Sequence, residues 1–473
     1  MTTDTPYVIA IVGAGPSGIY AAEALSQQSE VPVEIAVIDR LPVPFGLVRY
    51  GVAPDHESIR SIRNTLERTL ERPEVRFYGD VVVGSDLDIE ELRDAVDAVI
   101  YAYGAGSDKR LDIPGEDLPG SIAAAELVAW YCGHPDVHPD VDQPARDGQL
   151  VAAAIDGLIA TATQAVVVGV GNVALDVARV LMKSAPELTE TDMPDDVLES
   201  QARKAIREVR ILGRRGPAYT TFTTKELREL GQLPGVDVLV AANDLELDES
   251  SQAVVERSKV ASRNMAVLRE WADRTPTGAA KRIYLDFWTR PIKLIGGDRV
   301  TAVEVERTMI NPVGFVVGTG EIRVVPAQLV VRSVGYRGRP LPGLPYDNST
   351  GRVPHAEGRV IRDHGFSADE YVTGWIKRGP TGVIGTNKSD AVETVTSLLA
   401  DISDGAVVAH GRSGQLDRLL TQRGIHALGM PAWHRIDAAE IERGLKNGRR
   451  RTTLAHRSEL LAAAQNDDEP NLS

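Results

Sequence analysis

The sequence has a single cysteine, Cys132, among its 473 residues. One thiol cannot form a disulfide framework, a CxxC redox pair, a zinc cluster or a cysteine-ligated iron–sulfur centre within the chain. We therefore expect no metal site, and we interpret Cys132 as a buried, inert thiol.

Long apolar runs are also lacking. None approaches the ~20 residues of a membrane-spanning helix. The first residues, MTTDTPYVIAIVGAG, show no charged leader ahead of an apolar run, as a secretory signal would. We expect a cytoplasmic protein that has no membrane partner.

Basic side chains are in deficit, with 52 Lys and Arg against 67 Asp and Glu and a formal net charge of -15. This excess of negative charge argues against nucleic acids and anionic membrane surfaces as partners. The hydrophobic fraction of 43% is enough, over this length, to fill the cores of two or three domains.

A nucleotide-binding pattern follows the first apolar run. YVIAIVGAG predicts a strand of a parallel sheet that is covered on both faces. It leads into Gly13-Ala14-Gly15-Pro16-Ser17-Gly18 and then into an alanine-rich helical stretch. This is GxGxxG between a strand and a helix, where glycines let a pyrophosphate approach the backbone and the helix N-terminus favours its charge.

The next predicted strand, VEIAVIDR, ends in Asp39, 26 residues after Gly13. An acidic side chain at this point can accept hydrogen bonds from the hydroxyls of an unphosphorylated ribose. The first unit therefore suits FAD.

The pattern recurs in AVVVGVGNVALDVARVL, where Gly169, Gly171 and Ala174 form GxGxxA. The next strand candidate, VRILG, is followed by Arg214 and Arg215 in the place that Asp39 has in the first unit. Guanidinium groups there suit a ribose 2′-phosphate, and so NADP(H). The alternative is a solvated arginine pair in a turn, and the 45 residues from Gly169 to Arg214 weaken an argument from spacing alone.

Together the two units predict an α/β fold with two Rossmann-like dinucleotide-binding domains. We expect a FAD-binding domain made of residues 1–108 and 332–473, with an NADPH-binding domain, residues 109–331, inserted into it. A flavin beside a nicotinamide implies hydride transfer between them, with the protein mainly positioning the rings.

Longer motifs point to a family. The stretches LPVPFGLVRYGVAPDH, GRRGPAYTTFTTKELREL and YVTGWIKRGPTGVIGTNKSDA make the sequence similar to the adrenodoxin-reductase-type NADPH–ferredoxin reductases. The resemblance implies a glutathione-reductase-like fold and a FAD-dependent ferredoxin–NADP(+) reductase. Such an enzyme passes a hydride from NADPH to FAD and then single electrons to a ferredoxin, a small acidic iron–sulfur protein.

The resemblance also implies the residues that contact each cofactor. The flavin contacts, with the glycines of the first fingerprint, are Gly13, Gly15, Ser17, Gly18, Asp39, Leu47, Val83, Trp375, Gly382, Val383 and Ile384. The NADPH contacts are Gly171, Asn172, Val173, Arg214, Arg215, Glu226 and Gly382. From the residues alone, a core tryptophan is the favoured interpretation of Trp375.

GVAPDHESIRSIRNTLERTL predicts a helix that Asp55 caps, with His56 in its first turn. From the residues alone, His56 is interpreted as a histidine at the start of a helix that has no functional role. The resemblance instead associates His56, and an acidic residue of KELREL that we take to be Glu229, with the active site. Their role would be to orient the nicotinamide or to manage the flavin's proton.

An acidic partner requires local positive charge on this acidic chain. Arg60, Arg63, Lys377 and Arg378 are our candidates for a basic docking patch, against the alternative of scattered solvated charges. Arg449 to Arg451 are interpreted as a solvated face.

Other functions fit parts of the pattern. A dithiol reductase of the thioredoxin-reductase kind is excluded because it needs a CxxC pair. An NADPH diaphorase or quinone reductase without a protein partner remains an alternative, as does a non-catalytic nucleotide sensor.

Overall fold

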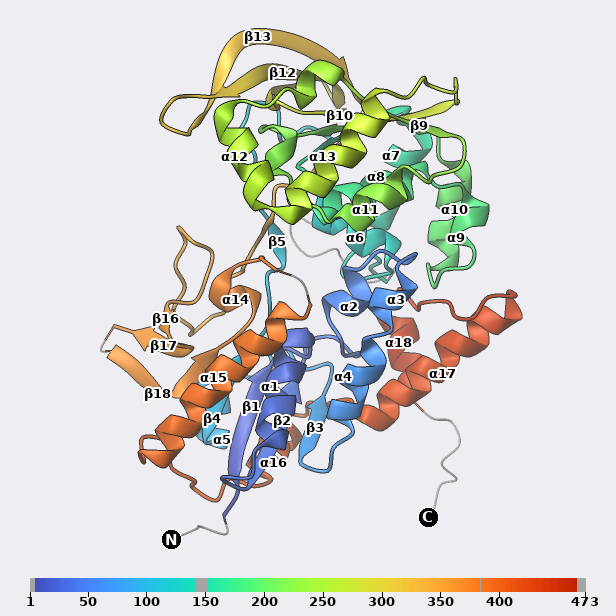
Figure 1. Ribbon diagram of the computed structural model, residues 1–473. Helices are drawn as coiled ribbons and strands as arrows, with labels where there is room; N and C mark the ends of the chain where they lie inside the picture. Colours follow the sequence, from blue (N-terminus) through green and yellow to red (C-terminus); the bar gives the residue numbers. More distant parts are fainter. Residues whose placement is uncertain (1–4, 141–150, 364, 383, 466–473) are drawn as a thin grey trace. The chain divides into compact units, whose positions relative to one another are not determined.

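The computed structural model describes residues 5–140, 151–363, 365–382 and 384–465 (Figure 1). The chain forms two compact units. Unit 1 combines Met1–Ser107 with Tyr336–Ser473, and unit 2 is Asp108–Gly335. Within the described ranges, no helix is both long and apolar enough to cross a membrane.

Unit 1 is built on a seven-stranded sheet in the order β16-β17-β18-β4-β1-β2-β3. Its strands are β1 (Tyr7–Val12), β2 (Val33–Ile38), β3 (Val75–Tyr78), β4 (Ala98–Tyr101), β16 (His355–Ala356), β17 (Arg359–Arg362) and β18 (Gly365–Val372). The strands from β18 to β3 are parallel, and β16 and β17 extend the sheet by antiparallel pairing. Because β1 has β2 on one side and β4 on the other, the strand order reverses there, which is where such sheets bind ligands.

Helices cover this sheet on both faces, which explains why every residue of β1 is buried and apolar. The helices of unit 1 are α1 (Pro16–Gln27), α2 (Leu47–Tyr50), α3 (Glu57–Arg60), α4 (Arg63–Leu70), α5 (Ile89–Ala95), α14 (Trp375–Arg378), α15 (Thr386–Ser403), α16 (Gln415–Gln422), α17 (Met430–Lys446) and α18 (Arg457–Ala464). α1 packs along α15 (Figure 1). On the opposite face Val8 and Val12 share a core with Leu92 of α5 and Leu416 of α16.

Unit 2 has a six-stranded parallel sheet in the order β6-β14-β7-β8-β10-β9. Its strands are β6 (Ser121–Ala123), β7 (Gln164–Val168), β8 (Glu208–Leu212), β9 (Val236–Val240), β10 (Lys281–Asp286) and β14 (Leu329–Arg332). Its helices are α6 (Ala124–Tyr131), α7 (Ala152–Thr161), α8 (Asn172–Met182), α9 (Ala185–Leu188), α10 (Asp195–Arg203), α11 (Thr224–Leu230), α12 (Glu249–Arg257) and α13 (Lys259–Ala272), with the 3-10 turns η1 (Pro217–Tyr219) and η2 (Ala242–Leu245). Short strands β5 (Ser107–Asp108) and β15 (Tyr336–Arg337) pair where the chain passes from one unit to the other.

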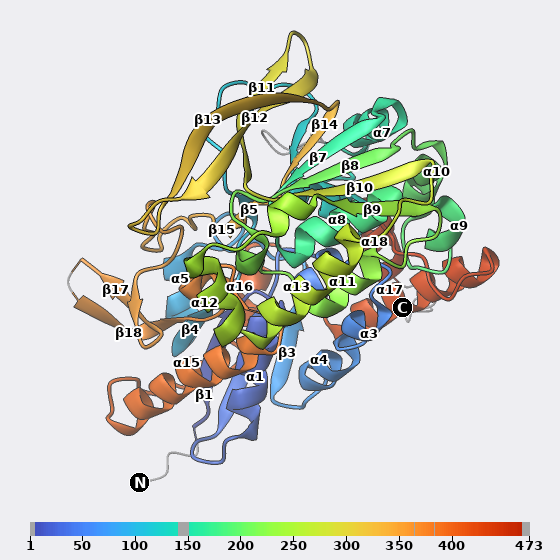
Figure 2. The ribbon, with the colours of Figure 1, turned by 45° about the horizontal axis from the view of Figure 1, so that its top comes forward.

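A second sheet in unit 2 is antiparallel: β11 (Thr289–Gly296), β12 (Val300–Ile310) and β13 (Val316–Pro326). Figure 2 shows these strands as a layer of their own. Val303 and Val305 of β12 share a hydrophobic cluster with Val168 and Leu212, the last residues of β7 and β8. The antiparallel layer therefore packs at the ends of the strands that lead into the second fingerprint and the arginine pair.

Two helix predictions were wrong in detail. The stretch from residue 55 to residue 70 is not one helix but α3 and α4, and the residue before α3 in the N-cap position is His56 rather than Asp55. The interpretation of Arg449 to Arg451 as a solvated face was wrong for two of the three residues. Arg450 is exposed, whereas Arg449 and Arg451 are each 6% exposed. The Arg451 guanidinium binds the buried carboxylate of Glu440.

Candidate active site

The first fingerprint forms a cradle at the end of β1. Gly13 has a φ of +114°, and a Cβ there would lie 2.6 Å from the carbonyl oxygen of Ala102. A Cβ on Gly18 would lie 1.9 Å from the Gly13 carbonyl oxygen. At Gly15, in contrast, a Cβ would meet nothing within 4 Å, so this glycine faces open space ahead of α1. Two glycines serve the turn itself, and the third leaves room for a ligand.

Asp39 follows β2 and is tied to this cradle. Its Oδ2 accepts a hydrogen bond from Ala14 N at 2.7 Å, and its Oδ1 accepts one from Leu41 N at 2.9 Å. Burial raises the pKa of the carboxyl, and these two main-chain donors act against that rise. Each carboxylate oxygen has a second lone pair, so these bonds orient Asp39 without using all of its acceptor capacity.

The loop that leads into α2 lies directly on the cradle. Phe45, with a φ of +85°, donates its N–H to Ala14 O at 2.8 Å. A Cβ on Gly46 would lie 3.0 Å from the Cα of Gly15. Leu47, the first residue of α2, is exposed beside this contact, whereas Val83 is buried in the same core as Val12. A non-glycine residue with positive φ in such a place is uncommon and marks a loop held by its surroundings.

The segment before α15 lies against the same cradle from a third side. Gly374 has a φ of +76°, and a Cβ there would lie 2.3 Å from Ser17 Oγ. Trp375 is half-buried with its ring 5.4 Å from that of Tyr336, so it is not a core tryptophan. Gly382 is exposed with a φ of +83°, and Ile384 is half-buried. Val383 lies outside the described residues.

Ser17 connects this segment to the first fingerprint. Its Oγ donates to Asn387 Oδ1 at 3.0 Å, and Arg378 donates to the same oxygen. Residues 370 positions apart in the sequence thus meet at the N-terminal end of α1.

The second fingerprint repeats the geometry in unit 2. Gly169 has a φ of +129°, and a Cβ there would lie 2.1 Å from the Ser333 carbonyl oxygen. Gly171 again faces nearly open space, with only Thr221 Oγ1 at 3.4 Å from its notional Cβ. Asn172 and Val173 open α8, and Asn172 Oδ1 accepts a hydrogen bond from Thr223 N at 2.8 Å. The loop is therefore fixed from the side of α11.

The arginine pair follows β8, and its main chain is anchored on both residues. Thr308 Oγ1 donates to Arg214 O at 3.0 Å, and Trp288 N donates to Arg215 O at 3.3 Å. Both arginine side chains are exposed. The Arg215 guanidinium lies 5.6 Å from the centre of the Tyr219 ring, whose hydroxyl is 3.0 Å from Ser250 Oγ. Sequence reasoning missed Tyr219, although an aromatic residue four positions after an arginine was a visible signal.

The acidic residues of KELREL lie on α11. Glu226 is 6% exposed, with its carboxylate 3.7 Å from Arg179, and Thr223 Oγ1 accepts its N–H as the helix cap. Glu229 is half-buried, 3.7 Å from Lys225 Nζ. His56 is buried at the start of α3. His56 belongs to unit 1 and Glu229 to unit 2, so their joint action stays a prediction.

The proposed docking patch was wrong for two of its four residues. Arg60 is 9% exposed and donates to the carbonyl of Arg49. Lys377 is 3% exposed and pairs with carboxylates of α15. Because both cations are buried against internal acceptors, they are not available to an incoming protein. Arg63 and Arg378 are half-buried.

Comparison with known proteins gives one family. The family model described as "Pyridine nucleotide-disulphide oxidoreductase" matches residues 7–230. NADPH-ferredoxin reductase FprA of Mycobacterium tuberculosis is 44% identical, over 96% of this chain and 98% of the relative. The mitochondrial NADPH:adrenodoxin oxidoreductase of Arabidopsis thaliana is 36% identical, over 98% and 96%. The solved structure of Mycobacterium tuberculosis FprA in complex with NADPH matches with a TM-score of 0.88 and 43% identity, over 97% of this chain and 99% of that one. The predicted fold class is thereby confirmed.

Proposed function

The chain belongs to the adrenodoxin-reductase-type NADPH–ferredoxin reductases, and from this membership we propose that it is a FAD-dependent NADPH–ferredoxin oxidoreductase. One observation of the structure carries the proposal. The two fingerprints have similar backbone geometry, but β2, the strand after the first, is followed by Asp39, whereas β8, the strand after the second, is followed by Arg214 and Arg215. The two sites thus differ in the ribose they favour.

Unit 1 fits FAD. The open space at Gly15 and the free end of α1 suit the pyrophosphate, and Asp39 is held beside them for the ribose. When bound, FAD supplies the ring system that takes two electrons from NADPH and releases them one at a time. Our proposed FAD-binding residues in the described part of the chain are Gly13, Gly15, Ser17, Gly18, Asp39, Leu47, Val83, Trp375, Gly382 and Ile384.

Unit 2 fits NADPH in the same way. The open space at Gly171 and the start of α8 suit the pyrophosphate, and the exposed guanidinium groups suit the 2′-phosphate. The proposed NADPH-binding residues are Gly171, Asn172, Val173, Arg214, Arg215, Glu226 and Gly382. Under this proposal, unit 2 (Asp108–Gly335) is the NADPH domain. Its bounds are close to the expected range of residues 109–331.

His56 and Glu229 are proposed to orient the nicotinamide or to hold a proton for the flavin. Two observations support this role for His56. Its side chain is buried at the start of α3. It also lies a few residues after the loop that packs on the FAD cradle. Neither residue needs to act as a nucleophile, because the reaction transfers electrons and protons only.

The partner is a ferredoxin-type electron-transfer protein, and we propose that it is a small acidic iron–sulfur protein. With a net charge of -15 on this chain, such a partner is repelled at long range unless local positive charge offsets the repulsion. With Arg60 and Lys377 buried, Arg63 and Arg378 are the members of the original set whose side chains stay partly exposed. Salt should therefore change the rate of ferredoxin reduction but barely change the rate of dye reduction.

Steady-state turnover tests the proposal. NADPH and NADH are compared in parallel against a panel of ferredoxins, quinones and oxygen. We expect NADPH-dependent reduction of at least one ferredoxin well above the rates with quinone and oxygen. Fast quinone reduction with no turnover of any ferredoxin would instead identify a diaphorase that has no protein partner.

A further inference from the structure

The segment Thr373–Gly379 directly follows β18, on the way to α15, and cannot hold its own shape. Its only helix is the four-residue α14, which is far too short to be stable alone. Gly374 and Gly379 on either side of α14 have φ values of +76° and +84°. Contacts from elsewhere in unit 1 must therefore keep this segment in place.

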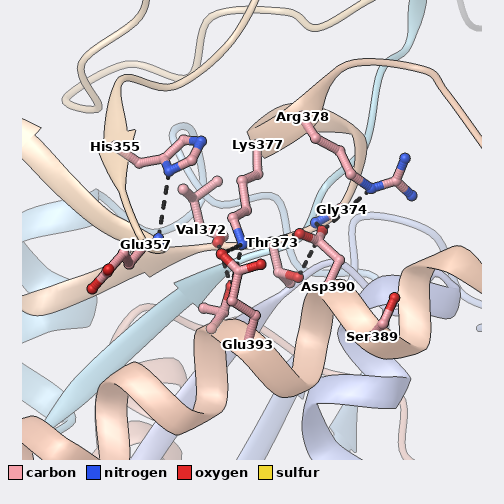
Figure 3. A network of polar contacts seen from close by, with 12 residues as sticks. His355, Glu357, Val372, Thr373, Gly374, Lys377, Arg378, Ser389, Asp390 and Glu393 are labelled. Atoms are coloured by element: carbon pink, nitrogen blue, oxygen red, sulfur yellow. Dashed lines mark hydrogen bonds and ion pairs between the residues drawn. The ribbon is translucent and has the colours of Figure 1, made fainter.

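Asp390 of α15 supplies several of these contacts (Figure 3). Its Oδ1 lies 2.9 Å from Lys377 Nζ, and its Oδ2 accepts hydrogen bonds from Gly374 N and, at 3.2 Å, from Thr373 Oγ1. Asp390 is 8% exposed. One buried carboxylate thus binds donors at both ends of the turn.

Lys377 completes the arrangement. Besides Asp390, its Nζ lies 3.0 Å from Glu393 Oε1 (Figure 3). It also lies 3.2 Å from Thr394 Oγ1. Its three donors are then all used, which is the condition under which a buried ammonium group is tolerated. Loss of the Asp390 charge would leave Lys377 with only the partly exposed Glu393 to balance it.

The held segment touches the proposed flavin site at two points. Gly374 lies against Ser17 of the first fingerprint, where a Cβ would come within 2.3 Å of Ser17 Oγ. The next residue, Trp375, has its ring 5.4 Å from that of Tyr336 and tilted by 31° to it. A shift of Gly374 would therefore move Trp375 and disturb Ser17 together.

Resting on the proposed function, we propose that Asp390, through Lys377 and Gly374, is a positioning residue for the flavin ring. It does not touch the flavin itself. It fixes the main chain that presents Trp375 and closes over Ser17.

The experiment compares Asp390→Asn with Asp401→Asn. Asp401 is a matched control because it also projects from α15 to the sheet, where it binds Arg359 at 2.8 Å and Tyr371 at 2.7 Å, away from the Thr373–Gly379 segment. The measurements are the Kd for FAD from flavin fluorescence, the visible flavin spectrum, the midpoint potential and the Tm of the apoprotein. We expect Asp390→Asn to weaken FAD binding about 10-fold, as expected for the loss of a charge-assisted bond, and to shift the flavin spectrum. Asp401→Asn should lower the Tm and leave the Kd for FAD, the flavin spectrum and the midpoint potential unchanged.

A lower Tm in both variants, with the Kd, spectrum and potential of each unchanged, would overturn the proposal and reduce Asp390 to a structural role. If Asp390→Asn does not fold, the pair is neutralised by Asp390→Asn with Lys377→Met, which removes the unpaired charge. Wild-type flavin properties in that double variant would likewise overturn the proposal. Wild-type protein that binds no FAD would instead overturn the proposed function, so the two failures are distinguishable.

Discussion

The hydroxyl of Thr308 donates a hydrogen bond to the main-chain carbonyl of Arg214 at 3.0 Å. Thr308 belongs to β12 in the antiparallel layer, and Arg214 follows β8 in the parallel sheet. The layer therefore anchors the loop that displays the two guanidinium groups. A binding group on a fixed main chain loses less conformational entropy when its ligand arrives.

Neutralising the arginine pair should abolish the preference for NADPH. We expect Arg214→Gln with Arg215→Gln to raise the KM for NADPH by about 100-fold, because each charge-assisted contact is worth roughly 1.5–3 kcal/mol. The KM for NADH should barely change. Arg228→Gln, an exposed arginine on α11, controls for net charge. Equal losses with both nucleotides would show that the pair is structural.

The anchor on Arg214 can be tested by itself. Thr308→Val keeps the shape of the side chain and removes only the donor to Arg214 O. We expect the KM for NADPH to rise about 3- to 10-fold with kcat unchanged, as a neutral hydrogen bond is worth about 0.5–1.5 kcal/mol. A kcat that falls as much as kcat/KM would contradict this assignment.

Tyr219 should matter through its ring. Tyr219→Phe keeps the surface under Arg215, whereas Tyr219→Leu removes it. We expect the leucine variant to raise the KM for NADPH a few-fold, since an exposed cation–π contact is worth about 0.5–1 kcal/mol. If the phenylalanine variant shows the larger loss, the bond to Ser250 is the one that positions the loop.

Two glycines of the first fingerprint should respond differently to alanine. A methyl group at Gly15 meets open space, so Gly15→Ala should leave the Tm of the apoprotein unchanged and yet block FAD binding. At Gly18 a methyl group would lie 1.9 Å from a carbonyl oxygen, so Gly18→Ala should destabilise the apoprotein itself. Calorimetry of the apoproteins and FAD titration separate the two effects. Unimpaired FAD binding by Gly15→Ala would contradict the placement of the pyrophosphate.

Glu440 predicts a specific acid sensitivity. Burial by itself would raise its pKa, but Arg49 and Arg451 lower the pKa to about 2. Because the folded pKa lies below the usual value of about 4.3, its contribution to stability is complete above that pH and is lost as the pH falls toward 2. Glu440→Gln should be less stable at pH 7, by about 3–5 kcal/mol for a broken buried ion pair. Between about pH 4.3 and about pH 2, the stability of Glu440→Gln should also change less than that of the wild type. Urea unfolding midpoints measured across this range check the prediction.

Much of the fold and both fingerprints could be predicted because each depends on neighbours in the sequence. The stretch from Gly13 to Gly18 places a strand, a turn and a helix in order, and the arginine pair directly follows an apolar strand. Tertiary partners could not be predicted in this way. The Arg49–Glu440 pair joins residues 391 positions apart, and no spacing rule reports it.

The same limit explains the error over basic residues. Arg60 and Lys377 occupy positions that look solvated in the sequence, yet each side chain has an internal acceptor that allows its burial. Whether a cation faces solvent depends on that acceptor and not on the local pattern. The roles of His56 and Glu229 also stay predictions.

The central claim is that one chain carries electrons from NADPH through FAD to a ferredoxin. Anaerobic addition of NADPH to the purified flavin-loaded protein, followed by oxidised ferredoxin, tests it most directly. We expect the visible flavin band to bleach with NADPH and to return as the ferredoxin is reduced. A protein that shows no flavin band, does not bleach with NADPH, or stays bleached when ferredoxin is added would contradict the account.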